Sequence, residues 1–198
     1  MEKKKTSASS NVPSEWECVS QTNHADCKIF RILKKEFRHP DGRHGDFYIQ
    51  EINDWIQVAA FVNDGGKKKI VMVNQFRFGE QKRSWEFAGG VIDKGESPLE
   101  AAKRELWEET GYTGKRAKVI ACFSPNPAIM NNKSYVVVIE DCKKTDTTHW
   151  DDNEEIQTKL VDVNRLDGMV ASGKIYHSIA ISSLYFIKKY LANKKART

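Results

Sequence analysis

The sequence predicts an α+β fold, an α/β/α sandwich around a mixed sheet, preceded by an antiparallel strand region. Strand-like apolar runs separated by Gly-, Pro- and Asp-containing turns fill most of the 198 residues, whereas helical periodicity is confined to three segments. Hydrophobic residues make up 39% and charged residues 30%, which is enough apolar material for a sizeable core. Strands mixed with a few helices are typical of this fold class.

The expected elements follow in chain order. Residues 1–15 predict a disordered tail, 16–54 an N-terminal strand region, and 55–193 the main domain. Strands are expected over 27–40, 44–55, 55–62, 69–78, 84–92, 117–123, 134–140 and 156–163, and helices over 97–110, 163–173 and 178–191. The turn NDGG between the two apolar runs 55–62 and 69–78 predicts a hairpin.

Composition limits the cellular compartment and the kinds of partner expected for the protein. No apolar run approaches the roughly 20 residues that span a bilayer. The four cysteines lack C-x-x-C spacing, so a reducing cytoplasm is expected rather than a zinc site or disulfide framework. The net charge of +5 is concentrated at the chain ends, which favours solvated tails over a nucleic-acid patch. An RNA or phosphate-rich partner stays open as an alternative.

The helix expected over 97–110 has clear end signals. Ser97 suits the N-cap, Pro98 the first helical position, and Glu100 completes an S-x-x-E capping box. Gly111 suits the position after the helix. Helical spacing predicts an apolar side made of Leu99, Ala102 and Leu106.

Three glutamates on this helix raise an electrostatic question. Glu105, Glu108 and Glu109 are spaced three and four residues apart, so they share another face of the helix. Their repulsion destabilises a bare helix, and Arg104 is expected to offset part of it through Glu100 and Glu108. A solvated acidic face would explain such a cluster, and so would a bound Mg²⁺ or Mn²⁺, because both ions prefer carboxylate oxygens.

The surrounding residues favour the metal. Gly90, Glu96, Arg104-Glu105-Leu106, Glu108-Glu109 and Gly111-Tyr112 occupy the fixed positions of the pattern G-x5-E-x7-R-E-U-x-E-E-x-G-U, where U is apolar or aromatic. This resembles the box of the Nudix hydrolase superfamily, whose members cleave a nucleoside diphosphate linked to another moiety. The resemblance implies an α/β/α sandwich in which the box forms a loop–helix–loop.

The same resemblance implies roles for individual residues. Glu105 and Glu109 would be metal ligands, and Glu108 a ligand or the base that activates water. The backbone carbonyl of Ala88 would be a further ligand. Glu96 and Arg104 would orient this cluster, with Arg104 counted among the catalytic residues. The expected cofactor is Mg²⁺, with Mn²⁺ as the alternative.

Four further segments resemble the ADP-ribose and nucleoside-diphosphate-sugar pyrophosphatases. VNQFRF resembles a strand whose arginine, here Arg77, contacts substrate phosphate. SWEFAGG resembles the family's E-x-x-A-G segment, which implies that Glu86 lies near the substrate. The acidic loop 146–155 would supply a catalytic or metal-binding glutamate, best matched by Glu154, and the segment through GKI and the final helix also fits. The N-terminal strand region resembles one that is exchanged between protomers, which implies a homodimer.

Other residues have two readings. Trp55 is able to stack on a nucleobase, although aromatic residues of this kind more often belong to a core or a dimer interface. Asn132 would touch the sugar or simply turn the chain. The five histidines are isolated in the sequence and predict surface or packing roles.

The leading hypothesis is a pyrophosphohydrolase that cleaves ADP-ribose or NDP-sugars to a nucleoside monophosphate and a sugar phosphate. One alternative is an RNA 5′-end or dinucleoside polyphosphate hydrolase. The other is an inactive Nudix domain that binds a nucleotide as a sensor. The intact set of glutamates argues against the sensor.

Overall fold

The computed structural model describes residues 12–150 and 155–196. The chain divides into two compact units, Met1–Glu51 and Ile52–Thr198. No helix within the described ranges is long and apolar enough to cross a membrane.

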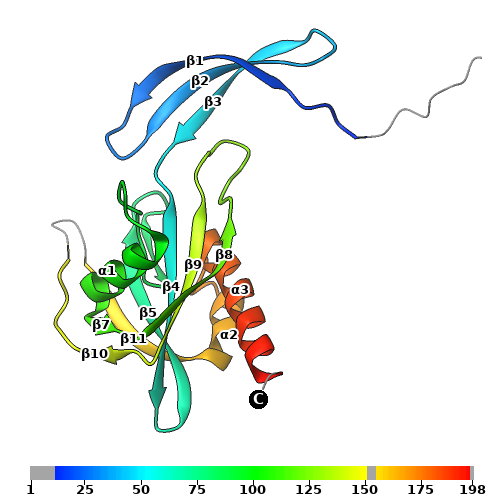
Figure 1. The fold of residues 1–198 in the computed structure, drawn as a ribbon. Coiled ribbons are helices and arrows are strands. Elements are labelled where there is room, and N and C mark those ends of the chain that lie inside the picture. The colour runs from blue at the N-terminus through cyan, green and yellow to red at the C-terminus, as the bar shows by residue number, and fades with distance from the viewer. Residues whose placement is uncertain (1–11, 151–154, 197–198) are drawn as a thin grey trace, which may run out of the picture. The chain divides into compact units, whose positions relative to one another are not determined.

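The described part of the first unit is a three-stranded antiparallel sheet in the order β1 (Glu17–Asp26), β2 (Arg31–Arg38), β3 (His44–Glu51) (Figure 1). The strands expected over 27–40 and 44–55 are confirmed as β2 and β3. Strand β1 was not predicted, because its sequence ECVSQTNHAD has no alternation of apolar and polar residues. The hydrogen bonds of its antiparallel ladder with β2 hold this segment as a strand.

The second unit contains the main sheet. In its described part, six strands form one sheet, with β6 (Lys82–Glu86) paired to β5. The other five lie in the order β11 (Gln157–Asp162), β5 (Lys67–Arg77), β4 (Trp55–Asp64), β9 (Ser134–Glu140) and β8 (Arg116–Phe123). Strands β4 and β9 run parallel and the other pairs antiparallel, so the sheet is mixed as predicted.

The predicted hairpin joins β4 to β5. Gly65 and Gly66 both have positive φ angles, of 57° and 80°, which a type I′ turn requires and glycine adopts without a Cβ clash. A two-residue ladder between β7 (Tyr112–Thr113) and β10 (Lys143–Lys144) was not predicted, because such a short pairing leaves no pattern in the sequence.

Helices cover both faces of the sheet (Figure 1). Helix α1 (Pro98–Thr110) packs through Ala102 and Leu106 on the face that carries Ile56 and Val58 of β4. The next residue of β4, Ala59, belongs to the opposite core, which is shared with the three C-terminal helices. These are η1 (Val163–Arg165), α2 (Leu166–Ala171) and α3 (Ser178–Lys195). The alternation of side chains along one strand therefore builds both cores, and the predicted α/β/α sandwich is confirmed.

Helix α3 is anchored at its C-terminal end. Glu140 at the end of β9 is 7% exposed and accepts hydrogen bonds from Lys194 Nζ at 2.7 Å and from the Tyr190 hydroxyl at 3.1 Å. Lys68 Nζ of β5 lies 3.4 Å from the second carboxylate oxygen. One buried carboxylate thus joins the helix to two strands.

Candidate active site in the glycine loop and helix α1

The segment between β6 and α1 is held against the start of β4. The carbonyl of Ala88 accepts the N–H of Val58 at 2.8 Å, and the carbonyl of Gly90 accepts the N–H of Ile56 at 2.9 Å. We call residues 88–90 the glycine loop. Because a carbonyl oxygen has two lone pairs, the Ala88 oxygen keeps one for a further partner.

Close packing explains the two glycines. A Cβ on Gly89 would overlap the Ile56 carbonyl, and a Cβ on Gly90 would overlap the carboxylate of Glu105. Neither position has a positive φ among those recorded for this chain, so the requirement is space rather than backbone conformation. The loop therefore runs between β4 and helix α1 without room for side chains.

Helix α1 starts and ends as the sequence predicts. Ser97 accepts the N–H of Glu100, and the Glu100 side chain accepts the N–H of Ser97 at 2.9 Å, which is the reciprocal capping box. Gly111 closes the helix in the left-handed conformation. The predicted contact between Arg104 and Glu100 is wrong, because the Glu100 side chain is bound to the N–H of Ser97 in the cap.

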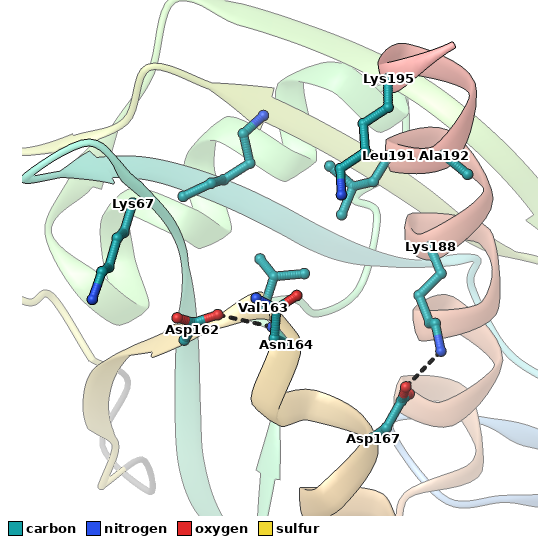
Figure 2. A pocket seen from close by; sticks show the side chains of 10 residues that line it. Lys67, Asp162, Val163, Asn164, Asp167, Lys188, Leu191, Ala192 and Lys195 are labelled. Atoms are coloured by element: carbon teal, nitrogen blue, oxygen red, sulfur yellow. Dashed lines mark hydrogen bonds and ion pairs between the residues drawn. The ribbon is translucent and has the colours of Figure 1, made fainter.

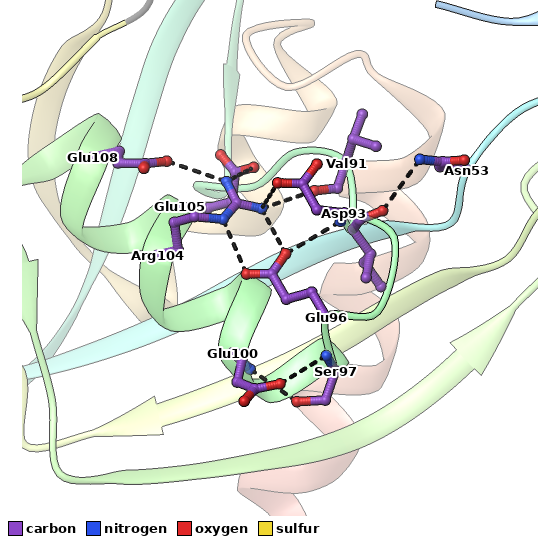
Figure 3. Close-up of polar contacts among 10 residues, drawn as sticks. Asn53, Val91, Asp93, Glu96, Ser97, Glu100, Arg104, Glu105 and Glu108 are labelled. Atoms are coloured by element: carbon purple, nitrogen blue, oxygen red, sulfur yellow. Dashed lines mark hydrogen bonds and ion pairs between the residues drawn. The ribbon is translucent and has the colours of Figure 1, made fainter.

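Arg104 is the centre of the polar cluster (Figure 3). Its guanidinium forms a bidentate pair with Glu96, through Nε at 3.0 Å and Nη2 at 2.8 Å. Nη1 donates to Glu105 at 2.8 Å and to Glu108 at 3.1 Å. Nη2 also donates to the Val91 carbonyl at 3.0 Å. One cation therefore holds three carboxylates and the loop that precedes the helix.

The charges in this cluster stabilise one another. The hydrogen bond from Arg104 is the main reason that the pKa of Glu96 lies below its usual value. In return, Glu96, Glu105 and Glu108 raise the pKa of Arg104 despite its partial burial. The repulsion expected among the glutamates is relieved here by the arginine.

Glu109 has a different environment from Glu105 and Glu108. It is only 2% exposed, since it follows Ala102 and Leu106 along the buried side of the helix. The prediction that Glu109 lies on a face separate from the apolar side is therefore wrong. Its Oε2 accepts the N–H of Gly89 at 2.9 Å. Glu105 and Glu109 therefore reach the glycine loop from the same helix, one beside Gly90 and the other at Gly89.

The two substrate-binding candidates Arg77 and Glu86 are bound to each other. Arg77 donates from Nε at 3.0 Å and from Nη2 at 2.7 Å to the two oxygens of Glu86, which is fully buried. Burial works against the charge of Arg77, but the hydrogen bond and charge of Glu86, joined by the charge of Glu109, raise its pKa. Glu86 is the last residue of β6 and precedes Ala88 by two positions, so this pair lies beside the start of the glycine loop.

Sequence reasoning missed His177, which also binds Glu86. Its Nδ1 lies 2.7 Å from Glu86 Oε2, although the two residues are 91 positions apart. Burial opposes ionisation of Glu86, but the hydrogen bonds from His177 and Arg77 outweigh it and bring the pKa down to about 2. No local pattern signals such a contact, because it depends on where helix α3 begins.

Trp55 and Asn132 lie at the entry to β4. The N–H of Trp55 donates to the Lys133 carbonyl at 2.8 Å, and Asn132 Nδ2 donates to the Asn53 carbonyl at 3.1 Å. Asn132 is 2% exposed, and its Oδ1 is buried without a hydrogen-bond partner in the described structure. Asn132 therefore connects the loop before β9 to the segment before β4.

Glu154 lies outside the described residues. The part of the acidic loop just before it is attached to helix α1. His149 N–H donates to the Glu108 carbonyl at 2.8 Å, and the Trp150 indole donates to the Glu109 carbonyl at 3.2 Å. The loop thus begins at the helix end that carries the glutamate pair.

The oxygen atoms that converge on the glycine loop suit a divalent cation. Among residues 12–150 and 155–196, no three His, Cys, Asp or Glu side chains already stand in ligating positions. The groups that meet at the glycine loop are nevertheless all oxygens, from Glu105, Glu109 and the Ala88 carbonyl, and hard cations prefer such ligands. Mg²⁺ commonly takes one or two protein carboxylates and completes its shell with water and substrate phosphates. The residues therefore fit a metal shared with a phosphorylated substrate.

A separate cavity of about 580 Å³ lies near the turn of the β4–β5 hairpin (Figure 2). It is lined by Lys67, Lys68, Asp162, Val163, Asn164, Asp167, Lys188, Leu191, Ala192 and Lys195. Lys67 pairs with Asp64 at the far end of β4, roughly 20 Å along the strand from the Val58–Ala88 bridge. Lys188 is paired with Asp167 at 2.6 Å, and none of the site residues above lines this cavity.

Comparison with known proteins decides the family. The model of the NUDIX domain matches residues 55–179, more than half of the chain. The chain belongs to the Nudix family. Its glycine loop, helix α1 and glutamate cluster all lie within the matched residues.

Relatives of this Nudix chain carry related names. It is 26% identical over 162 residues to the ADP-ribose pyrophosphatase of Bacillus subtilis (strain 168), covering 81% of this chain and 86% of that protein. It is 29% identical over 133 residues to the ADP-ribose pyrophosphatase of Escherichia coli (strain K12), covering 63% and 64%. A segment of 70 residues, 35% of the chain, is 40% identical to 32% of the ADP-sugar pyrophosphatase of Mus musculus.

The fold is shared with a solved structure described as an ADP compounds hydrolase. The TM-score is 0.82 at 19% sequence identity, over 93% of this chain and 98% of that chain. At this identity the likeness confirms the Nudix fold. The family and the relatives together indicate that the chain is a hydrolase.

Proposed function

We propose that the protein is a divalent-metal-dependent pyrophosphohydrolase that acts on ADP-ribose or NDP-sugars. Water would attack one phosphorus of the diphosphate and the bond from that phosphorus to the bridging oxygen would break, giving a nucleoside monophosphate and a sugar phosphate. The relatives named ADP-ribose and ADP-sugar pyrophosphatases support this substrate class. The observation that carries the proposal is the convergence of Glu105 and Glu109 on the glycine loop, which begins two residues after the Glu86 that binds Arg77.

The carboxylates would hold the cation, Mg²⁺ or in its place Mn²⁺. Glu105, Glu109 and the Ala88 carbonyl are the proposed ligands, and Glu108 is a further ligand or the base. When bound, the metal would neutralise the diphosphate oxygens and lower the pKa of a water molecule. Arg104 would keep Glu105 and Glu108 directed at the site, with its own orientation set by the bidentate pair with Glu96.

The remaining residues would bind the substrate or complete the chemistry. Arg77 suits a diphosphate because it carries a permanent charge and a planar fork of donors. Glu86 fixes the guanidinium by its bidentate contact with Nε and Nη2, so the remaining N–H groups of Arg77 would face the diphosphate. Trp55 is proposed to stack on the base and Asn132 to bind the sugar, while Glu154 is proposed as a catalytic carboxylate of the acidic loop.

A substrate panel tests the proposed function. The purified protein is incubated with Mg²⁺ and ADP-ribose, several NDP-sugars, Ap4A or 5′-triphosphorylated RNA, and the products are separated. We expect AMP and ribose phosphate from ADP-ribose, or the corresponding pair from an NDP-sugar. Turnover of RNA or Ap4A alone would refute the proposal in favour of the first alternative. Nucleotide binding without turnover of any substrate would favour a sensor.

We also propose a homodimer in a reducing, cytoplasmic compartment. All four cysteines are free thiols, which suits such a compartment. In the first unit, Trp16 and Phe47 remain 39% and 45% exposed although their rings contact each other, and exposed aromatic clusters often mark interfaces. Light scattering after size exclusion should give twice the chain mass of 22.7 kDa, and a monomer would contradict the dimer.

A further inference from the structure

Glu86 is fully buried, and two side chains approach its carboxylate, Arg77 from β5 and His177 from the start of α3. Arg77 donates to both of its oxygens, and His177 Nδ1 adds a third short contact to Oε2. A carboxylate that accepts from a guanidinium at both oxygens has no hydrogen to donate. Nδ1 of His177 therefore carries the hydrogen and donates it to Glu86.

The chain before α3 is attached along β6, which carries Glu86. The N–H of Trp85 donates to the Lys174 carbonyl at 2.9 Å. The Tyr176 hydroxyl donates to the Lys82 carbonyl at 3.1 Å, and Lys82 Nζ lies 4.3 Å from the centre of the Tyr176 ring. Contacts at both ends of the strand thus fix the position from which His177 reaches Glu86.

Helix formation does not account for a histidine at position 177. His177 is the N-cap residue of α3, where Ser, Thr, Asp or Asn would bond to the first-turn N–H groups. Its side chain makes no such bond. The imidazole is instead committed to Glu86, a contact that benefits the site rather than the helix.

We propose that His177 is a positioning residue for substrate binding: it holds Glu86 in place and thereby directs the guanidinium of Arg77 at the substrate diphosphate. This rests on the proposed function to the extent that Arg77 binds the diphosphate. Without His177, Oε2 of Glu86 loses one of its two donors, and the Glu86–Arg77 pair can rotate as a unit. Weaker ground-state binding of the anion follows, with the metal-binding carboxylates unaffected.

Steady-state kinetics of three variants test the role. His177→Ala should raise KM roughly tenfold, as expected for loss of a supporting hydrogen bond, with kcat within about threefold of wild type. His177→Asn should restore most of the affinity, because its amide N–H lies near the position of Nδ1. Ser178→Ala, at the adjacent exposed position, serves as the matched control. An unchanged KM in His177→Ala, or a fall in kcat alone, would refute the positioning role.

Two measurements separate this inference from the proposed function. Calorimetric titration with ADP reports diphosphate binding without turnover, and His177→Ala should weaken it by the same factor as KM. Long-range ¹H–¹⁵N spectra of wild type and Glu86→Gln report the protonated nitrogen of His177 directly. A bare Nδ1 in folded wild type would refute the inference even if ADP-ribose is hydrolysed. A protonated Nδ1 with weakened ADP binding in His177→Ala would support it even if no tested diphosphate is cleaved.

Discussion

The backbone N–H of Gly89 donates a hydrogen bond of 2.9 Å to Oε2 of Glu109. This contact joins the glycine loop to the last turn of helix α1, across 20 residues of chain. The carboxylate of Glu109 therefore satisfies a backbone donor and, under the proposed function, would also supply an oxygen to the metal. Accepting the hydrogen bond requires only a carbonyl-type oxygen, whereas binding the metal requires a charged carboxylate, so a mutation can separate the two roles.

Glu109→Gln should keep the hydrogen bond from Gly89 and lose the metal ligand. The amide oxygen still accepts from Gly89, so the melting temperature should change little. A neutral amide is a poor ligand for Mg²⁺, so kcat should fall by two orders of magnitude or more, since a metal contributes several kcal/mol to transition-state stabilisation. Glu109→Ala should lose activity and also about 1–3 kcal/mol of stability through the unpaired Gly89 N–H. Persistent activity in Glu109→Gln, measured with thermal unfolding as the folding control, would show that Glu109 is not a ligand.

Gly90→Ala should damage the site through its methyl group alone. The new Cβ would overlap the Glu105 carboxylate, which must then move away from the loop. We expect activity to fall roughly tenfold or more. The free energy of unfolding should change little, because the Cβ meets the end of a flexible side chain that is able to turn away. Gly168→Ala, at an exposed position of α2, is the matched control, since nothing lies within 4 Å of a Cβ built there. That control should keep full activity and gain up to about 1 kcal/mol. Equal behaviour of the two variants in kinetics and denaturant titration would contradict the steric argument.

Arg104→Lys should show that the geometry of the cation matters. Lysine keeps the charge but cannot hold Glu96 at two points while also reaching Glu105 and Glu108. We expect an activity loss of roughly 10- to 100-fold and a higher Mg²⁺ concentration for half-maximal rate. Lys103→Ala, exposed on the same helix, should leave both quantities unchanged. A Mg²⁺ titration of Arg104→Lys that matched wild type would rule out an orienting role for Arg104.

The contacts of Glu86 with Arg77 and His177 predict that the free energy of unfolding depends on pH in the acid range. Its pKa of about 2 lies below the ordinary 4.5, so the unfolded chain binds the proton more readily than the folded chain. The ionised carboxylate therefore stabilises the fold above about pH 4.5, and this contribution is lost as the pH falls towards 2. The free energy of unfolding should fall more steeply in wild type than in Glu86→Gln, by up to about 1.4 kcal/mol per pH unit. Parallel curves from urea titrations between pH 2.5 and 6 would contradict the assigned shift.

The parts of the fold that were predictable are determined by residues that lie close together in the sequence. Helix α1 was predicted because Ser97, Glu100 and Gly111 encode its ends within a few positions of one another. The β4–β5 hairpin was predicted because Gly65 and Gly66 interrupt two apolar runs. The burial of Glu109 was not predicted, because its charge grouped it with Glu105 and Glu108, although it follows Leu106 by three residues and so lies on the apolar side of the helix.

The missed features depend on contacts between distant residues. Strand β1 is polar throughout, and only its ladder with β2 makes it a strand. His177 acquires its role from Glu86, 91 residues away, through the attachment of the chain along β6. Arg104 was assigned Glu100 as a partner from helical spacing, but the capping box uses that glutamate and Glu96 in the preceding loop takes its place.

The sparse interior of the first unit has a consequence for the order of folding. Among its described residues only Leu33 is a buried hydrophobic residue, whereas the second unit has a continuous apolar core on each face of its sheet. A three-stranded sheet with so little apolar burial cannot offset its loss of chain entropy alone. We expect the described residues of the second unit to fold first as one cooperative unit, and the strands β1–β3 of the first unit to become ordered afterwards. In native-state hydrogen exchange, amides of β1–β3 should open at lower free energy than those of β4 and β9.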